Sequence, residues 1–156
     1  MAKNAVDMLI DDHNMVKQLF EQIIDGEDEE ERQELFDQLN LALRTHSKLE
    51  LEIFYPRAVE QKVGDKEWVE DAQEDHTLVE ETLDELVELG VDDEEFVAQL
   101  TELRDAVLDH ADNDEEGDIF ERVREKMSNA QLEEMGKEML DRRTQLMKEL
   151  KPATAR

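Results

Sequence analysis

Residues that interrupt helices are scarce in this chain. Its 156 residues include five glycines and two prolines, and the long stretches between them carry apolar residues three and four positions apart, which is the helical spacing. Runs of β-branched residues are few, and no Asn-Gly or Asp-Gly turn separates alternating segments, so strand signals are absent. The sequence therefore predicts an all-α fold.

Five helices are predicted, and most of their boundaries fall at recognisable signals. They run from about Ala5 to Asp25, Asp28 to Tyr55, Lys66 to Leu89, the Asp92-Asp93 pair to Met127, and Ser128 to Leu150. Gly26, Pro56, Gly90 and Pro152 follow four of these helices, while Ser128 and Gln131 form a capping-box pattern before the last. We expect a single domain over residues 1–156, in which an up-down antiparallel four-helix bundle spans about residues 5–127. The C-terminal helix, about residues 128–150, packs against the bundle or allows self-association.

The charge of the chain is strongly negative. Lys and Arg total 18, Asp and Glu total 45, and the formal net charge is −27. Such a field repels nucleic acid and anionic membranes and attracts cations.

The absence of cysteine excludes disulfides, thiolate metal sites and cysteine nucleophiles. Because acidic residues appear too early for a signal peptide and no apolar run reaches transmembrane length, we expect a cytoplasmic protein that binds neither nucleic acid nor membranes.

Each of the first four predicted helices contains one histidine on its apolar stripe. These are His13, His46, His76 and His110, and Glu50 follows His46 by one turn on the same stripe. A lone histidine on such a face is more often a hydrogen-bonded core residue. Four of them, buried without partners, would each cost roughly 1–3 kcal/mol, whereas a metal ion accepts imidazole lone pairs and neutralises carboxylates. The pattern favours an internal metal site over a purely structural bundle.

The segments around these histidines resemble a known family. LIDDHNMVKQLF, THSKLELEIFYP, EDHTLVEE and HADNDEEGDIF are similar to the haemerythrin-like HHE cation-binding domain over roughly residues 5–127, and MGKEMLDRR resembles the tail that often follows it. The resemblance implies a four-helix bundle that holds a non-haem centre of two iron ions. In such centres carboxylates bridge the irons and histidines fill most other positions.

Carried over residue by residue, the resemblance implies a set of ligands: His13 and His46 to one iron, His76 and His110 to the other, and Glu50 as a bridge. One position departs from the oxygen carriers of the family. Glu80 stands one turn after His76, where those proteins have a second histidine. A carboxylate ligand there favours ferric iron, so reversible oxygen carriage is not expected.

The second bridging carboxylate has two candidates. A His-x-x-x-Glu spacing after His110 selects Asp114, whereas aligning Ile119-Phe120 with Phe54-Tyr55 selects Glu115. Five residues turn about 140° in a regular helix, so a Glu115 ligand requires a π-bulge, a feature frequent at functional sites. Glu115 is favoured and Asp114 is kept as the alternative.

Three nearby polar residues are interpreted as structural. Tyr55 is favoured as packing at a helix end, although its hydroxyl is within reach of the metals, and Asp112 and Glu116 are placed on a solvated face.

A ferrous pair with an open position binds O₂, peroxide or nitric oxide. We therefore expect a di-iron protein that binds or reacts with one of these, with peroxide or nitrogen-oxide decomposition as the enzymatic form. The alternative is an iron- or oxygen-responsive sensor or binding module without turnover.

Overall fold

The structure is a computed structural model that describes residues 4–154, apart from the side chains of residues 113, 114 and 151–154. Its elements are α1 (Ala5–Asp25), α2 (Glu29–Leu49), η1 (Glu50–Phe54), α3 (Tyr55–Glu60), α4 (Lys66–Leu89), α5 (Phe96–Asp109), η2 (His110–Ile119), α6 (Phe120–Lys126) and α7 (Asn129–Thr154). The segments η1 and η2 are π-helical turns. They join α2 to α3 and α5 to α6 without a break, so the described chain forms five helices and contains no strand. The predicted all-α class is confirmed.

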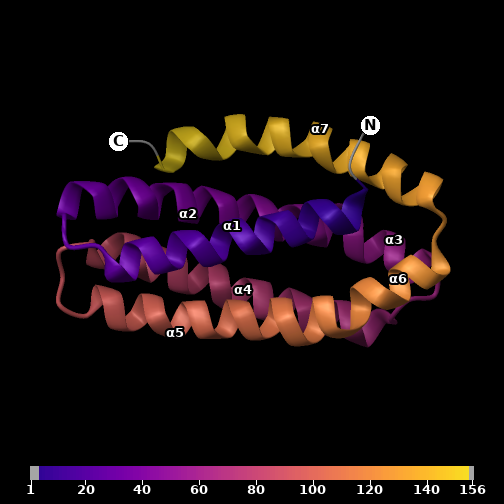
Figure 1. Cartoon of the computed structure of the whole chain (residues 1–156), viewed down its shortest axis with the longest axis horizontal. Coiled ribbons are helices and arrows are strands. Elements are labelled where there is room, and N and C mark those ends of the chain that lie inside the picture. Colours follow the sequence, from indigo (N-terminus) through magenta and orange to yellow (C-terminus); the bar gives the residue numbers. More distant parts are fainter. Residues whose placement is uncertain (1–3, 155–156) are drawn as a thin grey trace.

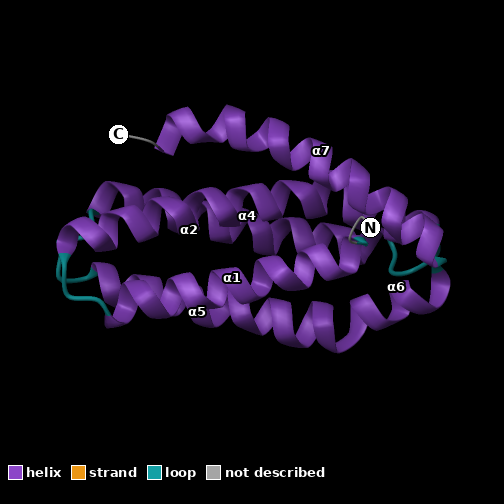
Figure 2. Ribbon diagram, turned by 45° about the horizontal axis from the view of Figure 1, so that its top comes forward, coloured by secondary structure: helices purple, strands orange, loops and turns teal. Residues whose placement is uncertain are grey.

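The first four helices form an up-down antiparallel bundle. The loops from α1 to α2 and from α4 to α5 lie at one end, and the connections from α3 to α4 and from α6 to α7 lie at the other (Figure 1). The last helix, α7, turns back along the outside of the bundle and packs on α1 and α2 (Figures 1 and 2). The predicted arrangement, a bundle with an additional C-terminal helix, is therefore the observed one.

Side-chain caps fix the beginnings of several helices. The side chains of Asn4, Asp28 and Asp65 accept hydrogen bonds from backbone N–H groups in the first turns of α1, α2 and α4. The predicted capping box is present before α7: Gln131 N donates to Ser128 Oγ at 3.1 Å, and Ser128 N donates to Gln131 Oε1 at 2.9 Å. Because these signals are local, α1 and α4 begin and end where the sequence predicts.

Two helix ends differ from the prediction. The second helix is interrupted near Pro56 rather than ended there, and it continues to Glu60, because the π-helical turn η1 lies just before Tyr55 and the proline. A proline ring clashes with the carbonyl four residues earlier in a regular helix, and the wider π-turn relieves that contact. The last helix extends to Thr154 rather than stopping near Leu150.

The apolar core is divided into two parts. One part lies towards α3, α6 and α7 and includes Leu9, Leu49 and Phe120. The other lies towards the α1–α2 and α4–α5 loops and includes Val16, Leu43, Leu83 and Leu103. The histidines of the first four helices fall between these groups in the sequence, so a polar layer separates the two apolar cores.

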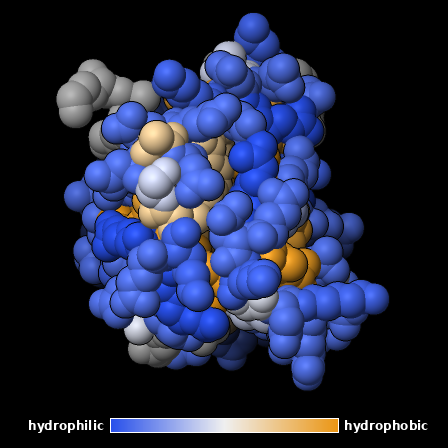
Figure 3. Space-filling view, turned by 90° about the vertical axis from the view of Figure 1, so that its right-hand side faces the viewer, coloured by the Kyte–Doolittle hydropathy of each residue, from blue (hydrophilic) through white to orange (hydrophobic). Residues whose placement is uncertain are grey.

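The surface is mostly hydrophilic, as Figure 3 shows for the end of the bundle that carries α3 and α6. On α7, Leu140 and Met147 are exposed, at 54% and 43%, and self-association through this helix stays a prediction. No helix among residues 4–154 combines the length and the apolar composition needed to cross a membrane.

Candidate metal centre

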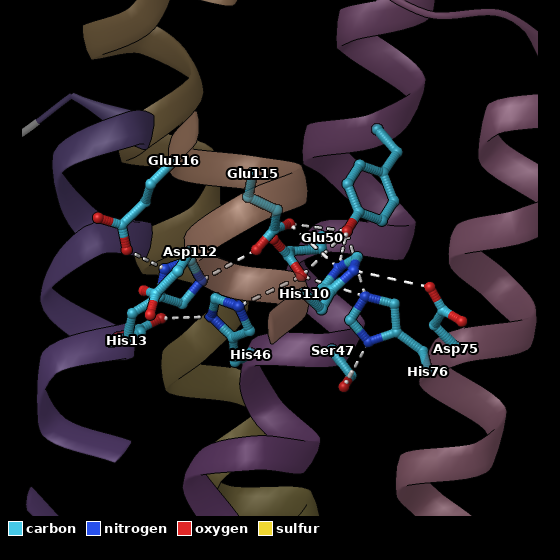
Figure 4. A network of polar contacts seen from close by, with 12 residues as sticks. His13, His46, Ser47, Glu50, Asp75, His76, His110, Asp112, Glu115 and Glu116 are labelled. Atoms are coloured by element: carbon cyan, nitrogen blue, oxygen red, sulfur yellow. Dashed lines mark hydrogen bonds and ion pairs between the residues drawn. The ribbon is translucent and has the colours of Figure 1, made fainter. Parts of the chain in front are cut away.

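Four histidines from four helices meet in the polar layer between the two cores. His13 comes from α1, His46 from α2, His76 from α4, and His110 is the first residue of η2. The first three are buried and His110 is half-buried. Their rings converge around two carboxylates (Figure 4). Helical periodicity placed all four on inward faces, and the structure brings them together.

Two fully buried carboxylates lie at the centre of the site. Glu50 and Glu115 are 0% and 1% exposed. Glu50 Oε1 lies 3.2 Å from His46 Nε2 and 3.1 Å from His76 Nε2. The two oxygens of Glu115 lie 3.0 Å from His13 Nε2 and 3.6 Å from His110 Nε2. Each carboxylate therefore reaches one histidine from each side of the site, as a bridging ligand would.

The potential ligand atoms form two clusters that share one residue. The first cluster contains His13, His46, Glu50 and Glu115, and the second contains Glu50, His76 and His110. Within each cluster the ligand atoms lie within 4.8 Å of one another. The division matches the pairing that the resemblance implies, with Glu50 between the two positions.

The predicted π-bulge after His110 is confirmed. A π-helical turn spans His110–Ile119, and it places Glu115 on the inward face beside His110, although the two are five residues apart. A regular helix would direct these side chains about 140° apart. The side chain of the alternative candidate, Asp114, lies outside the described residues.

The second ring nitrogen of each histidine faces a partner on its other side. The Nδ1 atoms lie 2.7 Å from Glu116 Oε2 for His13, 3.0 Å from Asp12 Oδ2 for His46, 2.8 Å from Ser47 Oγ for His76 and 3.6 Å from Asp75 Oδ2 for His110. Metal-binding histidines typically use one nitrogen for the metal and anchor the other in this way. All four Nε2 atoms are therefore directed to the centre.

Glu116 corrects one interpretation of the sequence. The sequence predicts a solvated position for this side chain, whereas its carboxylate reaches inward to His13. The reason is the π-turn, which rotates Glu116 from the outer face towards α1. Asp112 does lie on the exposed side, where its carboxylate pairs with Lys17 at 3.0 Å.

Tyr55 is the polar group that sequence reasoning undervalued. It is 1% exposed, and its hydroxyl donates to Glu115 Oε2 at 2.8 Å. The same hydroxyl lies 3.2 Å from Glu50 Oε1 and 3.2 Å from the Nε2 atoms of both His76 and His110. Tyr55 follows Glu50 by five residues across a π-turn, the same spacing that separates His110 from Glu115. Applying this five-residue spacing to the second predicted helix, as well as to the fourth, would have identified Tyr55 as a residue of the site.

The buried charges of the site shift its pKa values. Burial lowers the pKa of His46, but the carboxylates of Glu50 and Asp12 outweigh this effect and raise it well above its usual value. Burial likewise opposes the charge of His13, and the pKa is still raised because Glu115 lies beside it. Burial would raise the pKa of Glu50, yet the neighbouring His46 holds it well below its usual range. The centre therefore favours positive charge next to its carboxylates.

Tyr55 is held in its protonated form. Burial first, and then the nearby charges of Glu50 and Glu115, raise the pKa of its hydroxyl well above the usual value. The hydroxyl therefore acts as a hydrogen-bond donor to the carboxylates throughout the physiological pH range.

The donor set fits a pair of metal ions. Within the described residues, three buried polar atoms of the site make no hydrogen bond: His13 Nε2, Glu50 Oε2 and Glu115 Oε1, although His13 Nε2 and Glu115 Oε1 are within ion-pair distance of each other, at 3.0 Å. Buried polar atoms are nearly always satisfied, so unsatisfied ones indicate a missing partner. Imidazole nitrogens and carboxylate oxygens are ligands for divalent transition metals, and two cations at the two clusters would satisfy all three atoms.

The structure does not bring Glu80 into the site. Its side chain is half-buried, belongs to neither cluster and does not line the adjoining cavity. Its role as a ligand stays a prediction, as does the ligand role of the other predicted residues.

A cavity of about 570 Å³ adjoins the centre. The four histidines and both carboxylates are among its lining residues, together with apolar residues of α1, α2, α4 and α5 such as Val16, Leu43, Val79 and Leu103. Exposed Leu78 is also part of the lining. The site is therefore reached through a mostly apolar space between the helices.

These features define a class of cation-binding helical bundle, and comparison with known proteins identifies it. The model of the Hemerythrin HHE cation binding domain matches residues 4–123. The chain belongs to this family, as its sequence motifs indicated.

Two individual proteins are similar to the chain. One is a solved structure, a hemerythrin HHE cation binding domain-containing protein from Mycobacterium kansasii, with a TM-score of 0.78 and 27% identity over 92% of this chain and 87% of that one. The other is a curated protein from Nostoc sp. described as a DNA nickase, which is 26% identical over 94% of this chain. The chain spans 41% of the length of that relative.

Proposed function

We propose that this chain is a non-haem di-iron protein that binds or reacts with O₂, peroxide or nitric oxide. The observation that carries the proposal is the convergence of four Nε2 atoms and two buried carboxylates, with each histidine anchored on its far side. Family membership supports cation binding, and a site of nitrogen and oxygen donors without thiolate suits iron.

The proposed ligands divide between the two clusters. His13 and His46 would hold one iron and His76 and His110 the other, with Glu50 and Glu115 between them. A ferrous pair with an open coordination position supplies binding and electron transfer to O₂, peroxide or nitric oxide. The protein fixes the positions of the ligands through their outer partners and keeps the Tyr55 hydroxyl as a donor beside both carboxylates.

The test is metal analysis of protein made with ample iron and purified without a histidine tag. We expect about two irons per chain, one for each cluster. His46→Ala should lower the iron content sharply, because it removes a ligand beside the shared Glu50. Glu31→Ala, at an exposed position on α2, is the matched control and should not. A native protein with zero or one metal and full helicity would refute the di-iron proposal.

A second candidate function is an iron- or oxygen-responsive binding module without turnover. The position of α7 favours it, because this helix packs on α1 and α2, which carry the histidines of the first cluster. Peroxide consumption by the iron-loaded protein would support the enzyme. A metal-dependent change in shape or oligomeric state without consumption would support the binding module.

Nicking of DNA is not part of the proposal. The net charge of −27 repels the phosphate backbone, and the chain corresponds to less than half of the relative that carries that description.

A further inference from the structure

The helix α7 lies outside the residues that the family model matches. That match ends at residue 123, whereas α7 spans Asn129–Thr154. Leu132, Met135, Met139 and Leu146 are buried in the core that also contains residues of α1 and α2. Figures 1 and 2 show α7 running along the outside of these two helices. A side chain of α7 is therefore close enough to interact with groups behind the metal ligands.

Arg143 of α7 makes such an interaction. Its Nη2 atom donates to Asp12 Oδ2 at 2.7 Å, and the same Oδ2 atom lies 3.0 Å from His46 Nδ1. Asp12 is only 7% exposed. A buried carboxylate is strongly destabilised without a charged or hydrogen-bonding partner, and a charge-assisted bond to arginine is among the strongest available. Arg143 therefore fixes the carboxylate that orients His46.

The contacts continue to the shared bridging carboxylate. His46 Nε2 lies 3.2 Å from Glu50 Oε1, on the opposite side of the ring from Asp12. A continuous path of polar contacts thus runs from α7 through Asp12 and His46 to Glu50. Outer partners of metal-binding histidines fix ring orientation and increase ligand basicity.

We propose that Arg143 is a positioning residue for the metal centre, and that docking of α7 and metal binding at the first cluster are thereby coupled. The inference rests on the proposed metal centre. Arg143 holds Asp12 towards His46 Nδ1, so that Nε2 faces Glu50. Because coupling between two sites is reciprocal, metal binding also strengthens the attachment of α7.

The neighbouring residue provides a matched control. Arg142 donates to Glu52 Oε1 at 2.8 Å. The side chains of Arg142 and Glu52 are 30% and 39% exposed, so this is an ion pair at the surface. This ion pair also attaches α7 to the bundle, but Glu52 is not an outer partner of any of the four histidines. Arg142→Ala therefore removes a bond to α7 without touching the path to His46.

Metal affinity, measured by competition with a chelator, is the first readout. We expect Arg143→Ala to lower affinity by about 10- to 100-fold, the range typical of lost outer partners, Arg143→Lys to restore part of it, and Arg142→Ala to change it little. Asp12→Asn, which keeps the shape of the side chain, should weaken binding similarly. Since Arg143 acts through Asp12, adding Arg143→Ala to Asp12→Asn should cause little further loss.

Hydrogen exchange of the α7 amides is the second readout. Metal should increase their protection in the native protein and in Arg142→Ala, and increase it much less in Arg143→Ala. The inference would be overturned if Arg143→Ala and Arg142→Ala had equal metal affinities, or if the losses from Arg143→Ala and Asp12→Asn were fully additive. The proposed function would still stand in that case, provided that the native protein contains about two metals. A native protein that binds no metal would overturn both.

Discussion

The two halves of the candidate centre are built differently. In the first cluster, His13 and His46 are buried, and the outer nitrogen of each faces a carboxylate, that of Glu116 or Asp12. In the second cluster, His76 is anchored by a neutral hydroxyl, Ser47 Oγ. The side chain of His110 is 21% exposed, and its outer nitrogen lies 3.6 Å from a carboxylate oxygen of the exposed Asp75.

This difference suggests that the two metal positions have different roles. The first cluster consists of four buried residues, whereas the second includes the partly exposed His110, which Glu115 also reaches, at 3.6 Å. A metal held by more charge-supported ligands is retained more firmly. We therefore infer that the first position holds its metal more firmly and that the second, beside the partly exposed His110, is the more open of the two.

Glu50 is the residue on which both halves depend. It belongs to both clusters and is fully buried, so Glu50→Ala should reduce bound metal from about two ions per chain to nearly none. Metal analysis of the purified variant measures this. Glu52→Ala, two residues later and exposed, should keep the native content. Retention of a full metal complement by Glu50→Ala would show that the two positions are independent of it.

The histidines test the asymmetry directly. His110→Ala leaves the four ligands of the first cluster intact, so about one metal per chain should remain. His46→Ala damages the first cluster and leaves the second with its three ligands, so less metal should remain than in His110→Ala. Metal content after dialysis against a weak chelator measures the difference. Equal losses in the two variants would remove the distinction between the halves.

The pH dependence of the metal-free protein should report mainly on the first cluster. The pKa of His46 is raised, so its pairing stabilises the fold fully below its ordinary value of 6.5 and is lost as the pH rises through the raised pKa. The pKa of Glu50 is lowered, so its contribution to the stability of the fold is fully present above pH 4.5, its ordinary pKa. That contribution is lost as the pH falls through the lowered pKa. The stabilisation from this pair is therefore greatest between these values.

Thermal melts across pH measure this effect, and His46→Gln is the control because it removes the titrating imidazole. The difference in Tm between native metal-free protein and His46→Gln should shrink as the pH rises above neutrality. In addition, metal must displace the proton of His46, so binding should release protons and strengthen as the pH rises. A Tm difference that stays constant as the pH rises from about 6 to about 9, across the range in which a histidine with a raised pKa loses its proton, would contradict the assignment.

The sequence predicted most strongly what depends on local signals and periodicity. The glycines Gly26 and Gly90 mark the ends of α1 and α4, and the capping box of Ser128 and Gln131 marks the beginning of α7. Periodicity alone placed the four histidines on inward faces. The offset between His110 and Glu115 was also enough to predict a π-turn, because a regular helix cannot direct both inward.

What the sequence did not predict depends on contacts between distant segments. Asp12 and His46 are 34 residues apart, and Asp12 and Arg143 are 131 apart, so nothing in their spacing connects them. Tyr55 was interpreted as packing because the π-turn η1, which directs its hydroxyl to the centre, had not been expected. Glu116 was misplaced for a related reason, since a π-turn changes the direction of every side chain it carries.

Glu80 offers the smallest expected effect and the finest test of the asymmetry. The resemblance predicts it as a ligand of the second position, which would give that position a carboxylate of its own and make the halves more alike. In the structure its half-buried side chain belongs to neither cluster. On this geometry we expect Glu80→Ala and Glu80→His to keep the native metal content and the native reduction potential, because no ligand is lost or exchanged. Equilibrium redox titration at equal iron loading measures this. A raised potential in Glu80→His, as a neutral imidazole replacing an anionic ligand would produce, would instead establish Glu80 as a ligand and show that the second position is the less open one.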